Sequence, residues 1–359
     1  MKKFPLILSL ILIVSLLAGC AGTPVVYYTN CTCPVDAHTE VKAPDESYVP
    51  AEGALKTGLA ISTSLKKSAA ATAEADGKAD YDVTMVAVLV DDNGVIQDCI
   101  IDGIASSITF DVSGTIKTDL TAAPQTKNEL GENYNMVKYG GAIAEWDAQA
   151  KALADFAVGK TVEQLRSGAV SESGYAPQGT DLATQATIYL GGYVNTIEAA
   201  VANAKHLGAQ SGDALKLATI AKFDSSAAAT SEKDGNAQLD ADVVALTLKN
   251  ETITSCYLDS VQAKVAFDAS GAIKTANLNE PVPTKNELGE NYGMVAWGKA
   301  KAEWNVQAES FAKYVTGKTP SDVAGIHVDE TTKPTDADLS ASVTIKIGGF
   351  QNLIAKAAQ

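Results

Sequence analysis

The sequence contains few of the residues that build common catalytic centres. Its 359 residues include only three histidines, His38, His206 and His327, which lie far apart in the chain. This spacing argues against a His-rich metal cage and a repeated Ser-His-Asp triad. Basic residues are also scarce, with 28 Lys and Arg against 43 Asp and Glu. The resulting net charge of −15 argues against nucleic-acid binding through a basic patch.

An apolar segment at the amino terminus has the composition of a targeting sequence. Two lysines precede a run from Phe4 to Leu17, which is shorter than the roughly 20 residues that a membrane span requires. The run ends in Leu-Ala-Gly followed by Cys20, which resembles the lipobox of bacterial lipoproteins. That resemblance implies cleavage before Cys20 and a diacylglycerol on its sulfur. We therefore expect residues 1–19 to be a signal peptide, and the mature protein to be lipid-anchored to the cell membrane on its extracytoplasmic side.

Residues 20–52 contain several prolines and show no hydrophobic periodicity, which predicts a flexible linker after the lipidated cysteine. Cys31 and Cys33 lie within it. A Cys-x-Cys pair can be a redox dithiol or half of a metal site, but no second ligand pair follows at a suitable spacing. We interpret the pair as a linker feature.

The remainder of the chain is an internal duplication. Residues 126–134, with the sequence Thr-Lys-Asn-Glu-Leu-Gly-Glu-Asn-Tyr, recur identically at 284–292; this nine-residue sequence is called the repeated block below. Asp76-Gly77 recurs as Asp234-Gly235 at the same offset. Because the repeat is far longer than a solenoid unit, each copy is expected to be a domain. We place repeat 1 at 53–209 and repeat 2 at 210–359.

Each repeat is predicted to begin with strands and to end with helices. In repeat 1, residues 81–90 and 95–102 alternate in hydrophobicity around a turn signal at 91–94, and a second hairpin is expected over 107–118. The corresponding strands of repeat 2 are expected at 243–248, 252–258 and 263–275. Apolar residues at helical spacing predict one long helix from Met294 to Val315, and a last helix is expected over 349–357. The predicted fold class is α+β, with two tandem homologous domains that each form an antiparallel β-meander followed by helices.

Two further motifs recur in both repeats. Gly-Lys-Thr occurs at 159–161 and 317–319, but the glycine that a phosphate loop needs five residues earlier is replaced by Ala154 and Ala312, so Thr161 and Thr319 are expected to be helix N-caps. Cys99 and Cys256 occupy equivalent strand positions and are expected to be buried free thiols.

The repeated block is the first candidate for a binding site. Its identity in two copies that otherwise differ widely is compatible with a structural turn and with ligand binding by its polar side chains. The candidate ligand-binding residues are Lys127 and Tyr134 in repeat 1, and Lys285 and Tyr292 in repeat 2.

A second motif lies near the end of each repeat. Asp181 to Thr187 and Asp338 to Thr344 keep the same Asp-to-Thr spacing, and Gly192 and Gly349 follow before the last predicted helix. Together with the preceding elements, this motif resembles the signature of the FMN-binding domain family, found in flavin-carrying subunits of Na⁺-translocating quinone reductases and Rnf-type complexes. The resemblance implies FMN at both sites, linked by a phosphoester bond to Thr187 and Thr344. It also implies electron transfer to a redox partner.

The motif departs from the family pattern at its glycine, which is replaced by Gln185 and Ser342. A side chain there would obstruct the flavin transferase, and we expect no covalent flavin on the native chain. Two functions are carried forward: an extracytoplasmic lipoprotein that transfers electrons through FMN, and a noncatalytic ligand-binding or scaffold lipoprotein that has lost the flavin. No residue is assigned a catalytic or metal-binding role, and the chain by itself is not expected to be an enzyme.

Overall fold

A computed structural model of the chain describes residues 53–359, which belong to one compact unit. The predicted signal peptide, Cys20, and the linker with Cys31 and Cys33 lie outside the described residues.

Each repeat forms a three-stranded antiparallel sheet in which the strands are neighbours in chain order. The strands of repeat 1 are β1 (Lys56–Ser64), β2 (Gly77–Val90) and β3 (Ile96–Phe110), and those of repeat 2 are β4 (Ala214–Lys222), β5 (Gly235–Lys249) and β6 (Thr252–Phe267). The predicted order of strands first and helices later is confirmed, and so is a mixed α and β architecture.

The strand boundaries differ from the prediction. The expected strands at 95–102 and 107–112 are parts of one longer strand, because β3 continues through Phe110 and pairs along the whole of β2, from Gly77–Phe110 to Val90–Ile96. The turn of the expected hairpin at 107–118 is present in a short form, with a bridge between Phe110 and Ile116 and a hydrogen bond of 2.9 Å from the Lys117 N–H to the Thr109 carbonyl. The first strand of each sheet, β1 or β4, was not predicted.

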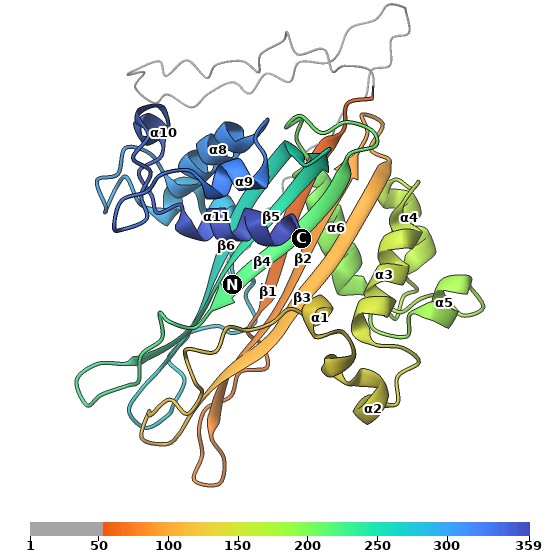
Figure 1. The fold of residues 1–359 in the computed structure, drawn as a ribbon. Coiled ribbons are helices and arrows are strands. Elements are labelled where there is room, and N and C mark those ends of the chain that lie inside the picture. Colours follow the sequence, from red (N-terminus) through yellow and green to blue (C-terminus); the bar gives the residue numbers. More distant parts are fainter. Residues whose placement is uncertain (1–52) are drawn as a thin grey trace, which may run out of the picture. The chain divides into compact units, whose positions relative to one another are not determined.

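The helices follow the strands in each repeat. Repeat 1 contains α1 (Lys127–Leu130), the 3₁₀ helix η1 (Gly131–Tyr134), α2 (Met136–Gly140), α3 (Trp146–Ala157), α4 (Val162–Ala169), α5 (Asp181–Gln185) and α6 (Gly191–Ala202). Repeat 2 contains α7 (Lys285–Leu288), η2 (Gly289–Tyr292), α8 (Trp304–Val315), α9 (Pro320–Ala324), α10 (Ala337–Ser342) and α11 (Gly348–Ala357). Figure 1 shows α3 to α6 on one side of the strands and α8 to α11 on the opposite side.

The long helix expected from Met294 to Val315 is also wrong at its start, because α8 begins only at Trp304. The carboxylate of Glu303 accepts hydrogen bonds from the backbone N–H groups of Met294 and Val295, at 2.8 and 2.9 Å, and so holds a turn that precedes the helix. Trp297, which was expected on the buried stripe, is therefore 88% exposed.

The inner faces of the two sheets share one hydrophobic core. It includes Leu59, Met85 and Ile104 from repeat 1 and Val243 and Val265 from repeat 2. Two further cores lie between each sheet and the helices of its own repeat. Apolar side chains at alternate positions thus serve the shared core on one face of a strand and the helix layer on the other.

The phenylalanines that end β3 and β6 stack in the shared core. The ring centroids of Phe110 and Phe267 are 4.0 Å apart and the planes differ by 6°. A Cβ atom at Gly235 would lie 2.6 Å from the Phe267 ring, and Gly77 is placed in the same way against Phe110. The repeated Asp-Gly pairs are therefore explained by the close approach of a ring to the backbone.

The loops at the same end of the sheets exchange hydrogen bonds between the repeats. Ala71 N–H donates to the carbonyl of Gly271, and Ala229 N–H donates to the carbonyl of Gly114, both at 2.9 Å. This pair of contacts is reciprocal, as expected if a pseudo-twofold axis relates the repeats.

Local capping agrees with the sequence. Thr161 and Thr319 are the N-caps of α4 and α9, and each forms a capping box with the side chain three residues later.

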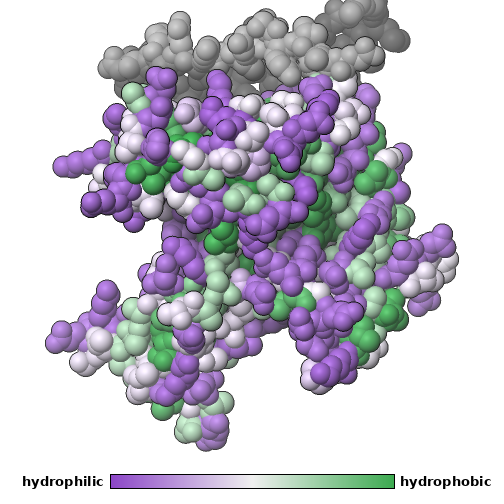
Figure 2. All heavy atoms as spheres, in the orientation of Figure 1, coloured by the Kyte–Doolittle hydropathy of each residue, from purple (hydrophilic) through white to green (hydrophobic). Residues whose placement is uncertain are grey.

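The face in Figure 2 is largely hydrophilic, with hydrophobic residues in scattered patches. Of the helices within residues 53–359, none has the length and apolar character needed to cross a membrane.

Candidate functional site

The repeated block forms a tight turn whose first and fourth residues cap its helix. Thr126 Oγ1 accepts a hydrogen bond from the N–H of Glu129 at 3.1 Å, and Glu129 Oε2 accepts from the N–H of Thr126 at 2.8 Å. Thr284 and Glu287 repeat this arrangement, at 3.2 and 2.7 Å. The Thr and Glu of the block are therefore required by the backbone of the turn.

A buried aspartate in the third strand of each sheet fixes the block to that sheet. Asp259 Oδ1 accepts from the N–H groups of Ser260 and Asn286 at 2.7 and 3.1 Å, and Asp102 is bonded in the same way in repeat 1. Asn286 Nδ2 also donates to the carbonyl of Leu258 at 2.9 Å. Burial raises the pKa of Asp259 to about 6, although these hydrogen bonds favour the carboxylate.

The lysine of the block points into an aromatic cage in repeat 1. Lys127 is 5% exposed, and its Nζ lies 4.9 Å from the Trp146 ring centroid and 5.6 Å from that of Tyr134. Asp82 Oδ1 on β2 is 3.7 Å away, and Lys67 pairs with the other oxygen of the same carboxylate at 3.3 Å. Burial lowers the pKa of Lys127, despite the attraction of Asp82. The cage is thus occupied by the protein's own cation.

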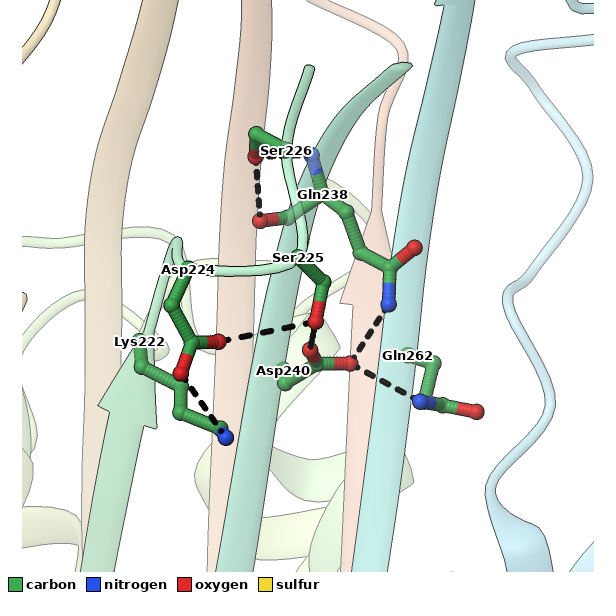
Figure 3. Close-up of polar contacts among 7 residues, drawn as sticks. All are labelled: Lys222, Asp224, Ser225, Ser226, Gln238, Asp240 and Gln262. Carbon is green, nitrogen blue, oxygen red and sulfur yellow. Dashed lines mark hydrogen bonds and ion pairs between the residues drawn. The ribbon is translucent and has the colours of Figure 1, made fainter. Parts of the chain in front are cut away.

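In repeat 2 the aspartate equivalent to Asp82 is Asp240, which binds other side chains and not the lysine of the repeated block. Figure 3 shows Asp240 in a polar cluster, where Ser225 Oγ donates to Oδ2 at 2.5 Å and the amide groups of Gln238 and Gln262 donate to Oδ1 at 2.7 and 3.0 Å. The Tyr292 hydroxyl donates to Gln262 Oε1 at 3.0 Å and so connects the repeated block to this cluster. In repeat 1, Ala105 takes the place of Gln262 opposite the aspartate.

The two lysines of the block therefore have different electrostatic settings. Lys285 Nζ lies 4.8 Å from the Trp304 ring and 5.3 Å from the Tyr292 ring, as in repeat 1. No carboxylate of residues 53–359 is within the 4.0 Å ion-pair distance of Lys285, whereas Lys127 has Asp82. Burial lowers the pKa of Lys285, and Asp242 is the main group that opposes this effect.

The predicted phosphoester acceptors occupy equivalent loops before the last helix. Thr187 donates its backbone N–H and its hydroxyl to Gln149 Oε1, at 2.8 and 3.3 Å. Thr344 binds Gln307 in the same way, at 2.7 and 3.1 Å. The β-branched residues around them also suggested a closing strand, but neither threonine lies in a strand.

The other residues of the motif that resembles the FMN-binding signature lie at helix amino termini. Asp181 and Asp338 are exposed in the first turns of α5 and α10. Gly192 and Gly349 lie in the first turns of α6 and α11, where a Cβ at Gly192 would meet no atom within 4 Å. Trp146 Nε1 donates to the hydroxyl of Tyr193 at 2.9 Å, which joins the start of α6 to the aromatic cage.

The two groups of candidate residues differ in accessibility. Thr187 is exposed, whereas Lys127 is 5% exposed and its ammonium group lies near the rings of Trp146 and Tyr134 and 3.7 Å from Asp82. The Lys127 side chain is therefore largely covered by its own neighbours.

The sequence did not predict a cavity of about 650 Å³ between the repeats. One wall is formed by residues 203–207 at the end of repeat 1, and hydrogen bonds between Lys205 and Thr57 fix this segment to β1. The other walls come from β6, from the repeated block and from α8. None of the predicted cofactor-binding residues lines it. The lining residues are Asn203, Lys205, His206, Leu207, Cys256, Tyr257, Leu258, Asp259, Asn286, Glu287, Asn305, Glu309, Ala312, Lys313 and Thr316.

The cavity combines apolar surface with charges of both signs. Leu207, Leu258 and Ala312 supply apolar surface, and Lys205 lies with its Nζ 5.4 Å from the Tyr257 ring. Burial raises the pKa of Tyr257 to about 12, with Asp259 and Glu309 adding to the shift. A signal for this cavity was present in the sequence, because Asn286 and Glu287 belong to the repeated block, but the block alone does not reveal which segment faces it.

The thiols agree with the expectation from the sequence. Cys99 and Cys256 are free and buried, and burial raises the pKa of Cys256 to about 12. A thiol in this state is a poor nucleophile at neutral pH.

Across residues 53–359, no group of three or more His, Cys, Asp or Glu side chains is arranged to hold a metal ion. The chain has no match among protein-family models, curated proteins or solved structures.

Proposed function

We propose that this protein is a membrane-anchored extracytoplasmic lipoprotein that binds a small polar ligand in the cavity between its two repeats. The observation that carries the proposal is the cavity itself. Its volume of about 650 Å³ lies within the range of ligand sites, and its lining combines apolar surface with many polar and charged side chains. Acylated Cys20 would hold this body at the membrane surface.

One lining group is particularly suited to a ligand. Asn305 Oδ1 is buried and has no hydrogen-bond partner, although leaving such an acceptor unpaired costs about 1–3 kcal/mol. A ligand N–H or O–H would satisfy it once rotation of the Asn305 side chain turned the oxygen toward the cavity. By contrast, the aromatic cages of both repeats are filled by Lys127 and Lys285, so they support the fold and do not offer space.

The test compares ligand binding with stability in one variant. Asn305→Leu removes the unpaired oxygen at similar volume, so we expect unchanged or higher thermal stability together with weaker binding. The probes are a library of amino acids, peptides, sugars and nucleotides in a thermal-shift assay, followed by calorimetry. Lys151→Met on α3, an exposed position in repeat 1, is the control. If no compound shifts the melting temperature of the parent protein, or if every shift persists in Asn305→Leu, the proposal is refuted.

The second candidate is an FMN carrier, favoured by the exposed Thr187 and by the shared Gln–Thr geometry of both repeats. When bound, FMN would supply the redox chemistry, and a separate redox partner would be required. Thr187 and Thr344 would hold the phosphate, while Gln149 and Gln307 would orient the two hydroxyls.

Intact-mass measurement on the protein from its native host tests this candidate. An FMN increment that is lost in the double variant Thr187→Val/Thr344→Val would establish it. Valine keeps the β-branched shape, so stability should change little. A native chain without the increment, still unmodified after coexpression with a flavin transferase, would reject covalent FMN.

A further inference from the structure

We infer that the ligand of the inter-repeat cavity is a short peptide in its zwitterionic form, with a free amino group and a free carboxylate. This inference rests on the proposed function, because it names the ligand class for the same cavity. It is carried by the order of polar side chains along α8 and by the absence of ion pairs among them.

Three polar residues of α8 line the cavity at intervals of four. Asn305, Glu309 and Lys313 occupy positions i, i+4 and i+8, which share one face of a helix. Two such intervals span about 12 Å at a rise of about 1.5 Å per residue. The cavity wall therefore carries acceptor groups in its first part and a cation at its far end. A peptide of about three residues, at about 3.3 Å per residue, matches this length.

Lys205, Glu309 and Lys313 are exposed side chains on the lining of the cavity, and none of them forms an ion pair with another described residue. Among residues 53–359, no acidic side chain lies within 4.0 Å of the ammonium group of Lys205 or Lys313, and no basic side chain lies within that distance of Glu309. Charges gathered on one concave surface produce a local potential that attracts ions of the opposite sign, even where the side chains are exposed. The lysines would bind a carboxylate, and Glu309 would bind an ammonium group.

The remaining acidic residues of the lining are already engaged, which makes the assignment more specific. Glu287 caps α7, and Asp259 accepts two backbone hydrogen bonds. The acceptors that remain for a ligand are thus Glu309 and the buried oxygen of Asn305. Both suit an amino group or a peptide N–H. A purely anionic ligand would leave them unpaired, and a purely cationic ligand would leave the two lysines unpaired.

Calorimetry with the full chain and four forms of trialanine tests this inference. The forms are the unmodified peptide, the N-acetylated peptide, the C-amidated peptide and the peptide blocked at both ends. We expect the unmodified peptide to bind at least tenfold more tightly than either singly blocked form. Glu309→Gln should weaken the unmodified peptide and leave the acetylated one unchanged. Lys313→Met should weaken the unmodified peptide and leave the amidated one unchanged. Lys151→Met should alter none of these affinities.

Two outcomes overturn the inference and differ in what they say about the cavity. Equal binding of all four peptides, or binding of a sugar, phosphate or nucleotide that depends on Asn305 while trialanine does not bind, excludes the zwitterionic class and leaves the binding function standing. Failure of every probe to bind overturns the proposed function together with this inference.

Discussion

Removing one ring of the Phe110–Phe267 stack should destabilise both repeats at once. Both side chains are fully buried in the shared core, and their centroids are 4.0 Å apart. Truncation of a buried phenylalanine costs about 3–5 kcal/mol, through lost burial and the cavity that remains. An aromatic pair adds about 0.5–1.5 kcal/mol beyond burial. We therefore expect Phe267→Ala to lower the free energy of unfolding by about 4 kcal/mol.

The coupling free energy between the two rings tests the shared core more directly than the cost of either single variant. In a double-mutant cycle, Phe110→Ala and Phe267→Ala together should cost less than the sum of the single variants by about 0.5–1.5 kcal/mol. Guanidinium denaturation, followed by circular dichroism and tryptophan fluorescence, measures each term, and both probes should report one transition.

Phe311→Ala provides the matched control. Phe311 is also fully buried, but it lies in the core between the sheet and the helices of repeat 2. It should cost a similar amount and show no coupling to Phe110→Ala. Additivity of the Phe110 and Phe267 variants, or a separate transition for each repeat, would refute the argument that a shared core makes the repeats cooperative.

Four further predictions follow from individual residues. Burial raises the pKa of Asp259 to about 6, above the value of about 3.9 in an unfolded chain, so its contribution to stability is full below about pH 4 and is lost as pH rises through 6. Asp259→Asn stays neutral, so it should remove this pH dependence of the free energy of unfolding, which amounts to about 2–3 kcal/mol in denaturation measured from pH 4 to 7. An unchanged pH dependence contradicts the prediction. Lys285→Met should raise the melting temperature, because burial of the ammonium group outweighs its attraction to Asp242, and a lower melting temperature would show that the cation stabilises the cage. A fragment of residues 210–359 exposes the inner face of its sheet, including Phe267, so light scattering should find a dimer; a stable monomer would contradict this. Cys20→Ser should release the protein from the membrane fraction, and retention would reject the lipobox.

Features that depend on neighbouring residues could be predicted from the sequence. The alternation of β2 and the N-caps at Thr161 and Thr319 follow from interactions within a few positions along the chain. The duplication was equally visible, because identical residues at a fixed offset need no structure to be recognised. The strands β1 and β4 were missed, since their sequences, KTGLAISTS and ALKLATIAK, do not alternate between apolar and polar residues and so carry no signal of period two.

The role of the repeated block in each copy depends on its tertiary surroundings. Its sequence is the same twice, yet Lys127 pairs with Asp82 while Lys285 has no ion-pair partner among residues 53–359, because Gln262 faces Asp240 across the sheet where repeat 1 has Ala105. The cavity is lined both by residues 203–207 and by α8, about 100 positions further along the chain. Local propensity cannot specify such contacts, because they are set by the way two sheets pack face to face around a shared core.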